Sequence, residues 1–190
     1  MRYLDVRTYH DTEIVSTADL KEHLRITFSD DDDYIDSLES AAVRRLEDFT
    51  NLFLLETNLN QFGNTFEDLN ILYKSPMLSE TPTIQYIKDG AFVTLAASNY
   101  EVIAAIKPPR IYASNSGTIP TADDVFQAWK ISYTVGYASA SAIPAPLIQA
   151  IKIMVADMYE NRQSVIVGKI VSEIPKTAEY LMMPYKVQTL

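Results

Sequence analysis

Cysteine is absent from this chain of 190 residues, and glycine and histidine are scarce, with five and two copies. The absence of cysteine excludes a disulfide framework, a thiolate metal site and a cysteine nucleophile. Five glycines leave little room for a phosphate-cradling loop, and the sequence has no dinucleotide fingerprint, Gly-x-Ser-x-Gly elbow or His-Glu-x-x-His motif. No apolar run approaches the roughly 20 residues of a membrane span, and nothing resembles a signal peptide. We therefore expect a soluble, intracellular protein that is not an enzyme and needs no cofactor or metal.

Four sets of polar residues remain as candidates for catalysis or metal binding, and each has a structural explanation. His10 and His23 are lone histidines of the kind that usually lie on a surface. The run Asp30–Asp33 lacks the spacing of a calcium loop, so we expect it to cap a helix N-terminus. Asp123-Asp124 is either a metal ligand pair or a surface turn, and the turn is favoured. Residues 160–162 (Glu-Asn-Arg) resemble an active cluster, but they fit better as a helix end where the arginine binds terminal carbonyls or a partner carboxylate.

The formal net charge of −9 is concentrated at the N-terminus. Residues 1–60 hold fourteen Asp and Glu against six Lys and Arg, whereas the remaining 130 residues hold eleven against ten. Tight binding to DNA phosphates needs clustered Lys and Arg, so this balance argues against a DNA-binding protein. An acidic wall would instead let a duplex slide past without sticking.

The N-terminal third predicts helices. Ser16 or Thr17 can cap a short helix, since Asp19 lies three residues after Ser16 as in a capping box. A longer helix follows the acidic run and ends near residue 50, with an apolar face. We expect that face to contain Ile35, Leu38, Ala42, Leu46 and Phe49, with Glu39, Arg44, Glu47 and Asp48 outside.

The middle of the chain predicts short strands. Residues 52–57 can extend, and residues 58–70 are expected to form a polar connection. Residues 83–88 alternate in polarity, Asp89-Gly90 suits a two-residue hairpin turn, and an apolar strand follows. Further strands are expected at residues 100–106, 110–113 and 127–135. The last of these should alternate, with Trp129, Ile131, Tyr133 and Val135 on one face.

The C-terminal third predicts a long helix that begins at Pro144 and Pro146, since proline suits the first helical positions. Its apolar positions cover more than the roughly 100° stripe of a surface helix, so we expect cover on two sides. That cover is either its own core or a neighbouring subunit. Residues 164–172 suggest a hairpin-like arm, and Pro175 opens a short helix to about Met182, which Pro184 ends before an extended tail.

Together these elements predict an α+β fold in which the two ends of the chain form a small helical bundle around an inserted, mainly antiparallel β lobe. The expected division is a helical part at residues 1–54, the β lobe at 55–135, and a helical part with an extended tail at 136–190. The outer two parts form one compact unit.

The order of motifs at both ends resembles the head–tail connector (adaptor) family of long-tailed double-stranded DNA phages and gene transfer agents. At the N-terminal end the match is residues 17–26, an acidic loop and a helix ending near Thr50. The middle, about residues 55–130, matches weakly. The matching C-terminal residues are Gly136, Tyr137, Pro144, Pro146, Tyr159, Glu160, Asn161, Arg162, Gly168, Pro184 and Tyr185.

The resemblance implies a structural subunit of the virion neck, assembled in the host cytoplasm. Such adaptors form a ring of twelve copies that docks on the portal protein, continues the DNA channel and receives a stopper or other neck or tail protein. Double-stranded DNA passes through without specific binding, and no membrane is involved. The alternative hypothesis is an enzyme or ligand-binding domain with an unrecognised site in the β lobe, which predicts a monomer or dimer with a concave polar pocket.

The resemblance also directs attention to two sets of contact residues. In the family the C-terminal segment engages the portal, and residues 176–190 here are unusually apolar for so short a helix and tail. The expected portal-binding residues are Tyr180, Leu181, Met182, Met183, Tyr185, Lys186, Val187 and Leu190. The expected subunit-interface residues are Val43, Ile148, Ile153, Met158 and Arg162.

Overall fold

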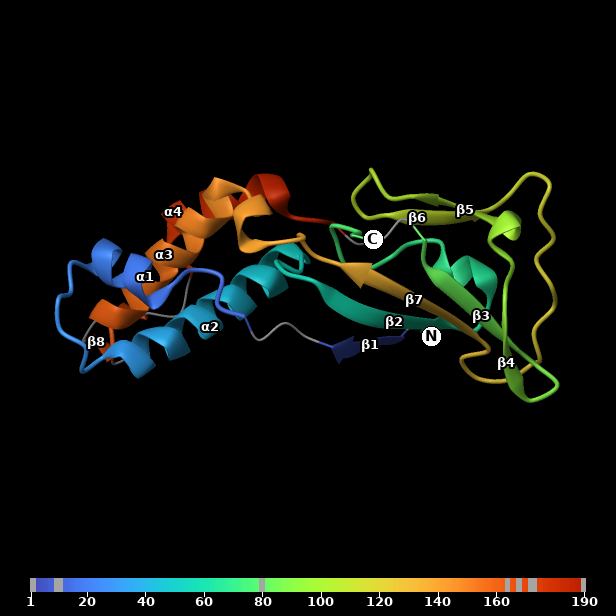
Figure 1. Cartoon of the computed structure of the whole chain (residues 1–190), viewed down its shortest axis with the longest axis horizontal. Coiled ribbons are helices and arrows are strands. Elements are labelled where there is room, and N and C mark those ends of the chain that lie inside the picture. The colour runs from blue at the N-terminus through green and yellow to red at the C-terminus, as the bar shows by residue number, and fades with distance from the viewer. Residues whose placement is uncertain are drawn as a thin grey trace. The chain divides into compact units, whose positions relative to one another are not determined.

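The chain divides into two compact units in the computed structural model, which describes residues 3–8, 12–78, 81–162, 165–166, 169–170 and 174–188. We call them the helical unit and the β unit (Figure 1). The helical unit comprises Asp11–Leu54 and Ser139–Lys186, and the β unit comprises Met1–His10, Leu55–Ala138 and Val187–Leu190. The predicted α+β class, with an antiparallel β part inserted between helical segments, is confirmed. The unit limits differ from the predicted division because both ends of the chain belong to the β unit.

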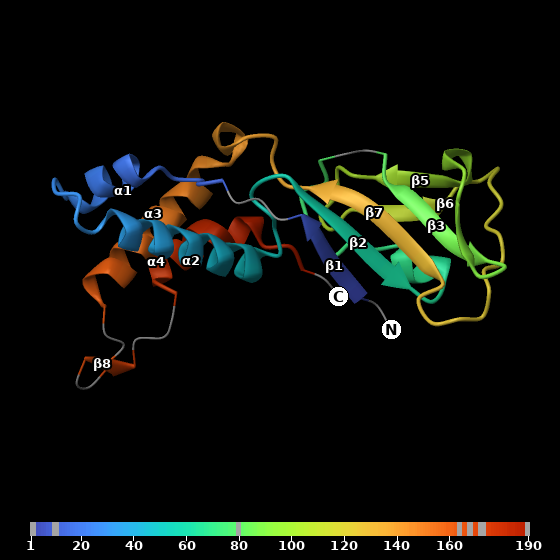
Figure 2. The same cartoon turned by 60° about the horizontal axis from the view of Figure 1, so that its bottom comes forward.

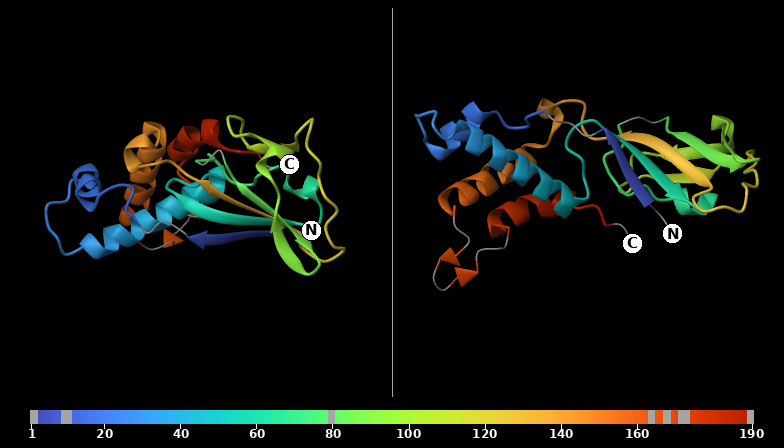
Figure 3. Two further views of the ribbon diagram at one scale, coloured as in Figure 1. Left: turned by 45° about the vertical axis from the view of Figure 1, so that its right-hand side comes forward. Right: turned by 90° about the horizontal axis from the view of Figure 1, so that it is seen from below.

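The helical unit is built around one long helix, α3, which packs against three other helices (Figure 3). This agrees with the prediction that the C-terminal apolar helix is covered on more than one side. No described helix is long and apolar enough to cross a membrane. The helices are α1 (Thr17–Leu24), α2 (Asp32–Thr50), α3 (Ala145–Glu160) and α4 (Lys176–Met182), with 3-10 turns η3 (Ala140–Ala142) and η4 (Met183–Tyr185). The core of this unit includes Leu20, Ile35, Leu38, Ala42, Leu46, Leu147, Ala150, Ile151, Met154 and Val155.

The predicted helix starts are found, with one correction in how they are capped. Ser16 precedes α1, and its Oγ accepts a hydrogen bond from the Asp19 amide at 3.1 Å, as a capping residue should. The acidic run does lie at the start of α2, but the Asp31 side chain makes no cap there. Its carboxylate binds side chains at the end of α3 instead.

Two carboxylates of α2 also lie where the sequence did not place them. Glu39 and Glu47 were expected outside, yet they are 5% and 3% exposed. Glu39 Oε1 accepts the amides of Ile14 at 2.9 Å and Val15 at 3.2 Å, and Glu47 Oε1 accepts the Leu54 amide at 2.8 Å. A buried carboxylate is tolerated when backbone donors satisfy it, so these two residues act as ties to the chain before α1 and after α2.

The β unit contains a five-stranded antiparallel sheet with the order β1-β2-β7-β3-β4 (Figure 2). A separate hairpin, β5-β6, belongs to the same unit. The strands are β1 (Tyr3–Thr8), β2 (Thr57–Gly63), β3 (Thr83–Lys88), β4 (Ala91–Thr94), β5 (Tyr100–Ile103), β6 (Arg110–Ala113) and β7 (Trp129–Val135), with short 3-10 turns η1 (Phe66–Leu69) and η2 (Ala97–Asn99). In the helical unit, β8 (Val165–Ile166) pairs with β9 (Lys169–Ile170), in keeping with the predicted hairpin-like arm.

One face of the sheet carries the core of the β unit, and β7 shows why. Trp129, Ile131, Tyr133 and Val135 are buried and alternate with half-buried residues, as the sequence predicted. The hairpin turn is also confirmed, since Asp89 and Gly90 have φ of 52° and 79° and join β3 to β4.

The strand β2 corrects the prediction of a polar connection at residues 58–70. Its polar side chains are held by partners that the sequence pattern does not reveal. Ser132 Oγ donates to Asn60 Oδ1 at 2.7 Å, and Thr134 Oγ1 donates to Asn58 Oδ1 at 2.7 Å, both across the β2–β7 pair. Polar pairs of this kind let asparagine, a poor strand former, occupy a central strand.

The first residues of the chain give a second correction. They were assigned to the N-terminal helical part, but β1 pairs with β2 in the register Asp5 to Asn60 and Leu4 to Gln61. Alternation is hard to recognise in a six-residue strand that contains both Asp5 and Arg7.

Candidate functional site

The face formed by α4 and η4 presents large side chains to solvent. Tyr180 is 71% exposed and Met183 is 55% exposed, whereas Leu181 and Tyr185 are half-buried. Lys186 is exposed, and its Nζ lies 4.4 Å from the centroid of the Phe49 ring. Exposed tyrosine and methionine together are typical of protein contact surfaces. We call these five residues, Tyr180, Leu181, Met183, Tyr185 and Lys186, the α4 face.

Three other residues expected in the portal-binding set do not belong to the α4 face. Met182 is fully buried on the opposite side of α4, together with Ala178. Val187 is 2% exposed and lies within the β unit. Leu190 lies outside the described residues. A helix of two turns must bury one side to stay attached, so only its other side can meet a partner.

Four of the five predicted interface positions fall into two groups. Val43 is 3% exposed, so its side chain packs inside its own chain, which corrects the expectation that it meets a neighbour. Ile148, Ile153 and Met158 are half-buried along α3. They retain apolar surface that a second subunit could cover.

The fifth predicted interface residue, Arg162, is part of a four-residue cluster between the start of α2 and the end of α3. Its Nη2 donates to Asp31 Oδ2 at 2.6 Å, and the Tyr159 hydroxyl donates to the same oxygen at 2.5 Å. The guanidinium lies 4.7 Å from the Tyr34 ring centroid and 4.9 Å from that of Tyr159. The sequence had offered a partner carboxylate as one role for this arginine, and Asp31 is that carboxylate.

The electrostatics of this cluster follow from its hydrogen bonds. The bond from Tyr159, followed by those from Arg162, holds the pKa of Asp31 below its ordinary value, although partial desolvation opposes the shift. The same bonds to Asp31 raise the pKa of Tyr159 and of Arg162. Asp31, Tyr159 and Arg162 therefore keep their usual charge at neutral pH, and their hydrogen bonds join the start of α2 to the end of α3.

The described residues offer little for catalysis or metal binding. They contain no group of three or more His, Asp or Glu side chains that could hold a metal ion. His23 is exposed on α1, and His10 lies outside the described residues. Asp123 Oδ2 accepts the Gly90 amide at 2.9 Å, which ties it to the β3–β4 turn. The Val125 amide donates to the Asp123 carbonyl at 2.9 Å, so the chain turns tightly at Asp124, in keeping with the turn interpretation.

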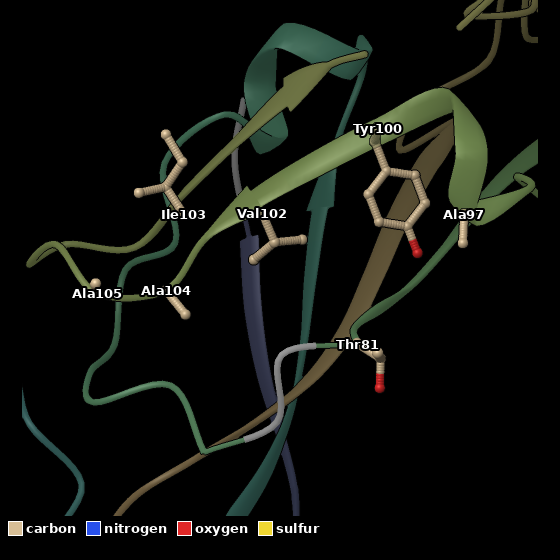
Figure 4. Close-up of a pocket in the computed structure, with 7 residues that line it drawn as sticks. All are labelled: Thr81, Ala97, Tyr100, Val102, Ile103, Ala104 and Ala105. Carbon is tan, nitrogen blue, oxygen red and sulfur yellow. The ribbon is translucent and has the colours of Figure 1, made fainter.

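One hollow in the β unit, of about 470 Å³, bears on the alternative hypothesis of an unrecognised ligand site (Figure 4). Tyr100 and Val102 point into it from β5, whereas Ile103 points to the other side of the strand. The Tyr100 hydroxyl donates to the Pro82 carbonyl at 2.7 Å, and burial raises the pKa of this tyrosine. The rest of the lining is Thr81, Ala97 and two further alanines, so this hollow is not the polar pocket that the enzyme hypothesis requires.

The sequence missed the apolar surface at one edge of the β unit. Phe92 and Val93 of β4 are 44% and 40% exposed, and Phe126 in the loop before β7 is 64% exposed. That loop is held beside the β3–β4 hairpin because the Asp123 amide donates to the Ile87 carbonyl at 2.9 Å. Two apolar residues in succession in a short strand after an Asp-Gly turn were the available signal, since a strand with one solvent face should alternate.

Comparison with solved structures finds the same fold in particles called gene transfer agents (GTA). A chain in the "Virion of native gene transfer agent (GTA) particle" matches with a TM-score of 0.79 and 20% identity, covering 98% of this chain and 96% of that one. A chain in the "Neck of empty GTA particle computed with C6 symmetry" also gives 0.79 and 20%, covering 99% and 97%. A chain in the "Neck of native GTA particle computed with C12 symmetry" gives 0.76 and 20%, with the same coverage of 99% and 97%.

No curated protein matches the chain. The model of the phage gp6-like head-tail connector protein family matches residues 15–130, which include the middle region that resembled the family only weakly. That match spans more than half of the 190 residues and confirms the resemblance noted in the sequence. The chain belongs to the phage gp6-like head-tail connector family.

Proposed function

We propose that this protein is the adaptor subunit of a virion neck, forming a ring of twelve copies below the portal protein. The observation that carries the proposal is family membership together with a fold match over nearly the whole chain to a neck component solved with C12 symmetry. In this role the ring joins the capsid vertex to a stopper or other neck or tail protein. Assembly would take place in the host cytoplasm, and the finished ring would remain in the virion.

The charge of the protein suits a channel through which DNA passes. The helical unit holds sixteen Asp and Glu against nine Lys and Arg, and the β unit holds nine against seven. A duplex in contact with a surface of this balance is repelled and can slide. The isolated subunit should therefore bind duplex DNA weakly at physiological salt, and sub-micromolar affinity in a filter-binding or anisotropy assay would contradict the passive channel.

The α4 face is the proposed portal-binding surface. Tyr180 and Met183 are its most exposed apolar side chains, and truncating anchors of this type commonly weakens an interface tenfold or more. Deleting residues 176–190 would be a poor test, because the deletion also removes the buried Ala178, Met182 and Val187. Substitution of exposed residues alone separates binding from folding.

The test uses the full chain and the portal protein of the same particle, mixed and imaged by electron microscopy. Wild-type protein should form a twelve-fold ring on the portal. The double variant Tyr180→Ser with Met183→Ser should bind the portal about tenfold or more weakly, and Phe28→Ser, which changes a 50% exposed residue before α2, should bind as wild type does.

Two outcomes contradict different parts of the proposal. Wild-type protein that stays monomeric or dimeric in the presence of portal overturns the ring function. A ring that forms on the portal equally well with the Tyr180 and Met183 substitutions retains the function but removes the α4 face from the portal contact.

A further inference from the structure

The sheet of the β unit ends in two open edges, β1 on one side and β4 on the other. Among the described strands, β1 pairs only with β2 and β4 only with β3. All four residues of β4 are exposed. An open edge presents unpaired backbone N–H and C=O groups, and soluble proteins usually protect such an edge with charge, proline or a covering segment. β4 has none of these within its sequence, Ala91-Phe-Val-Thr94.

The two edges run in the same direction. Five strands that are each antiparallel to the next place the first and the last strand parallel. In a twelve-fold ring each subunit is turned by 30° relative to the next, so no strand changes direction by more than that angle between neighbours. β1 of the next copy can therefore meet β4 as a parallel strand, whereas a two-fold dimer would pair β4 with β4.

The side chains of the two edges match on the core face of the sheet. Val93 lies opposite Tyr86 in β3, which in turn lies opposite Trp129, so Val93 is on the face that carries the core. Leu4 and Val6 of β1 lie opposite Gln61 and Leu59, on that same face. Val6 is 43% exposed and Val93 is 40% exposed. Each edge therefore offers apolar surface that the other can bury.

The other face of the sheet offers opposite charges. Phe92 is on this face, and Lys130 Nζ lies 4.6 Å from the centroid of its ring, at the β4 edge. Asp5 of β1 lies opposite Asn60, which lies opposite Ser132, two residues from Lys130 along β7. Asp5, in the edge strand β1, is thus on the same face as Lys130, which lies in the middle strand β7 but extends its ammonium over Phe92 of β4. Joining the edges of two copies therefore brings a carboxylate toward an ammonium.

We propose that β4 of one copy pairs in parallel with β1 of a second copy, so that the five-stranded sheet continues from subunit to subunit. A head-to-tail contact of this kind repeats from copy to copy until the ring is complete. The inference therefore rests on the ring function proposed above. The apolar match on one face and the charge match on the other both favour a second copy of this chain as the occupant of the β4 edge, rather than another neck protein.

The test exploits the absence of cysteine in the chain. Val6→Cys and Val93→Cys are introduced together in the full chain, which is mixed with the portal of the same particle and treated with a short bis-maleimide that tolerates either register. Each single variant is treated in parallel. A matched control combines Val6→Cys with Ile103→Cys, because Ile103 is 41% exposed but lies on β5, which belongs to the separate β5–β6 sheet.

The proposal expects a ladder of covalent multimers from the Val6 and Val93 pair, reaching twelve copies, with at least tenfold less product from the control pair and the single variants. Multimers absent from the double variant overturn it, and so do dimers from Val93→Cys alone, which would show two-fold pairing of β4. The mass of the untreated wild-type complex distinguishes the two failures: a ring that does not cross-link refutes only the edge contact, and the absence of any ring refutes the proposed function as well.

Discussion

In the helical unit the buried charged or amide side chains are carboxylates, whereas in the β unit they are amides. Glu39 and Glu47 can only accept hydrogen bonds, and each accepts from backbone amides next to a helix end. Gln61 both donates and accepts: its Nε2 donates to the Ile71 carbonyl at 2.8 Å, and its Oε1 accepts the Tyr73 amide at 3.3 Å. The buried carboxylates of the helical unit thus accept hydrogen bonds from backbone amides that flank a helix. The buried Gln61 of the β unit instead binds the backbone of a loop that runs beside its strand.

The two units also differ in formal charge and in the number of exposed apolar side chains. The helical unit carries a formal charge of −7, from sixteen acidic and nine basic residues, and the β unit carries −2, from nine and seven. Large exposed apolar side chains are more numerous in the β unit, at its strand edge and hairpins. Charge keeps one surface from associating, and exposed apolar area favours contacts on the other. In the helical unit, the exposed apolar surface is concentrated at Phe28, Tyr180 and Met183, whereas in the β unit it is spread over more positions.

The largest expected loss of stability is in the β unit at Gly136, whose φ is 110°. A Cβ at this position would lie 2.1 Å from the Leu55 carbonyl oxygen, so Gly136→Ala forces the backbone apart. We expect a loss of more than about 3 kcal/mol, or failure to fold. Gly90→Ala is the control, because Gly90 also has a positive φ of 79° but nothing lies within 4 Å of its Cβ position. It should cost about 1–2 kcal/mol.

Denaturant unfolding can assign this loss to one unit. Trp129 is the only tryptophan and lies in the β unit, so its fluorescence reports on that unit, and helical circular dichroism reports mainly on the other. A Gly136→Ala protein no less stable than Gly90→Ala would show that the close approach to Leu55 is not a constraint.

The next largest loss of stability is expected at Ile151 of α3, and Ile153 on the same helix serves as the comparison. Ile151 is fully buried and Ile153 is half-buried. Ile151→Ala should reduce the stability of the isolated subunit by about 2–5 kcal/mol. Ile153→Ala should reduce it by less than half as much and instead weaken the ring, measured as the fraction of protein bound to portal. Equal losses of stability for the two variants, with assembly unaffected, would place Ile153 in the internal core alone.

A smaller loss of stability is expected at Glu39, whose buried carboxylate accepts two backbone amides before α1. Glu39→Ala leaves the buried amides of Ile14 and Val15 without their acceptor, which should cost about 2–4 kcal/mol in chemical denaturation. Glu39→Gln keeps an oxygen at the same place and should cost only about 1 kcal/mol. If both substitutions cost the same, the negative charge, rather than the acceptor, would be the stabilising feature.

Much of the fold followed from local signals in the sequence. Ser16, the Asp89-Gly90 turn and the alternation in β7 each specify backbone geometry within a few residues, and all three are found as expected. Family membership also followed from the order of motifs at the two ends of the chain.

The errors concern residues whose environment is set by distant parts of the chain. Asn60 lies in a central strand because Ser132, seventy-two positions away, supplies a partner, and nothing near Asn60 indicates this. Glu39 appears polar and external until the amides of Ile14 and Val15 are placed beside it. For the candidate site, the sequence found the apolar character of residues 180–183 but not which side of α4 faces the core, because a two-turn helix has too few residues to define a stripe.

The smallest expected effect concerns the cluster of Asp31, Tyr159 and Arg162 in the helical unit, which should be sensitive to acid. Hydrogen bonds from Tyr159 and Arg162 lower the pKa of Asp31 below its ordinary value of 3.8. A carboxyl group whose pKa is lower in the folded state stabilises the protein above its unfolded pKa and loses that contribution as pH falls through the folded pKa. The difference in melting temperature between wild type and Asp31→Asn should therefore be constant from about pH 5 to 8 and shrink below about pH 4. Tyr159→Phe removes the first of the two donors and so raises the folded-state pKa of Asp31 toward its ordinary value. In that variant the loss should be smaller and should be complete at a higher pH. A difference between wild type and Asp31→Asn that stays unchanged down to about pH 2.5 would mean that the ionised carboxylate does not hold the two helix ends together.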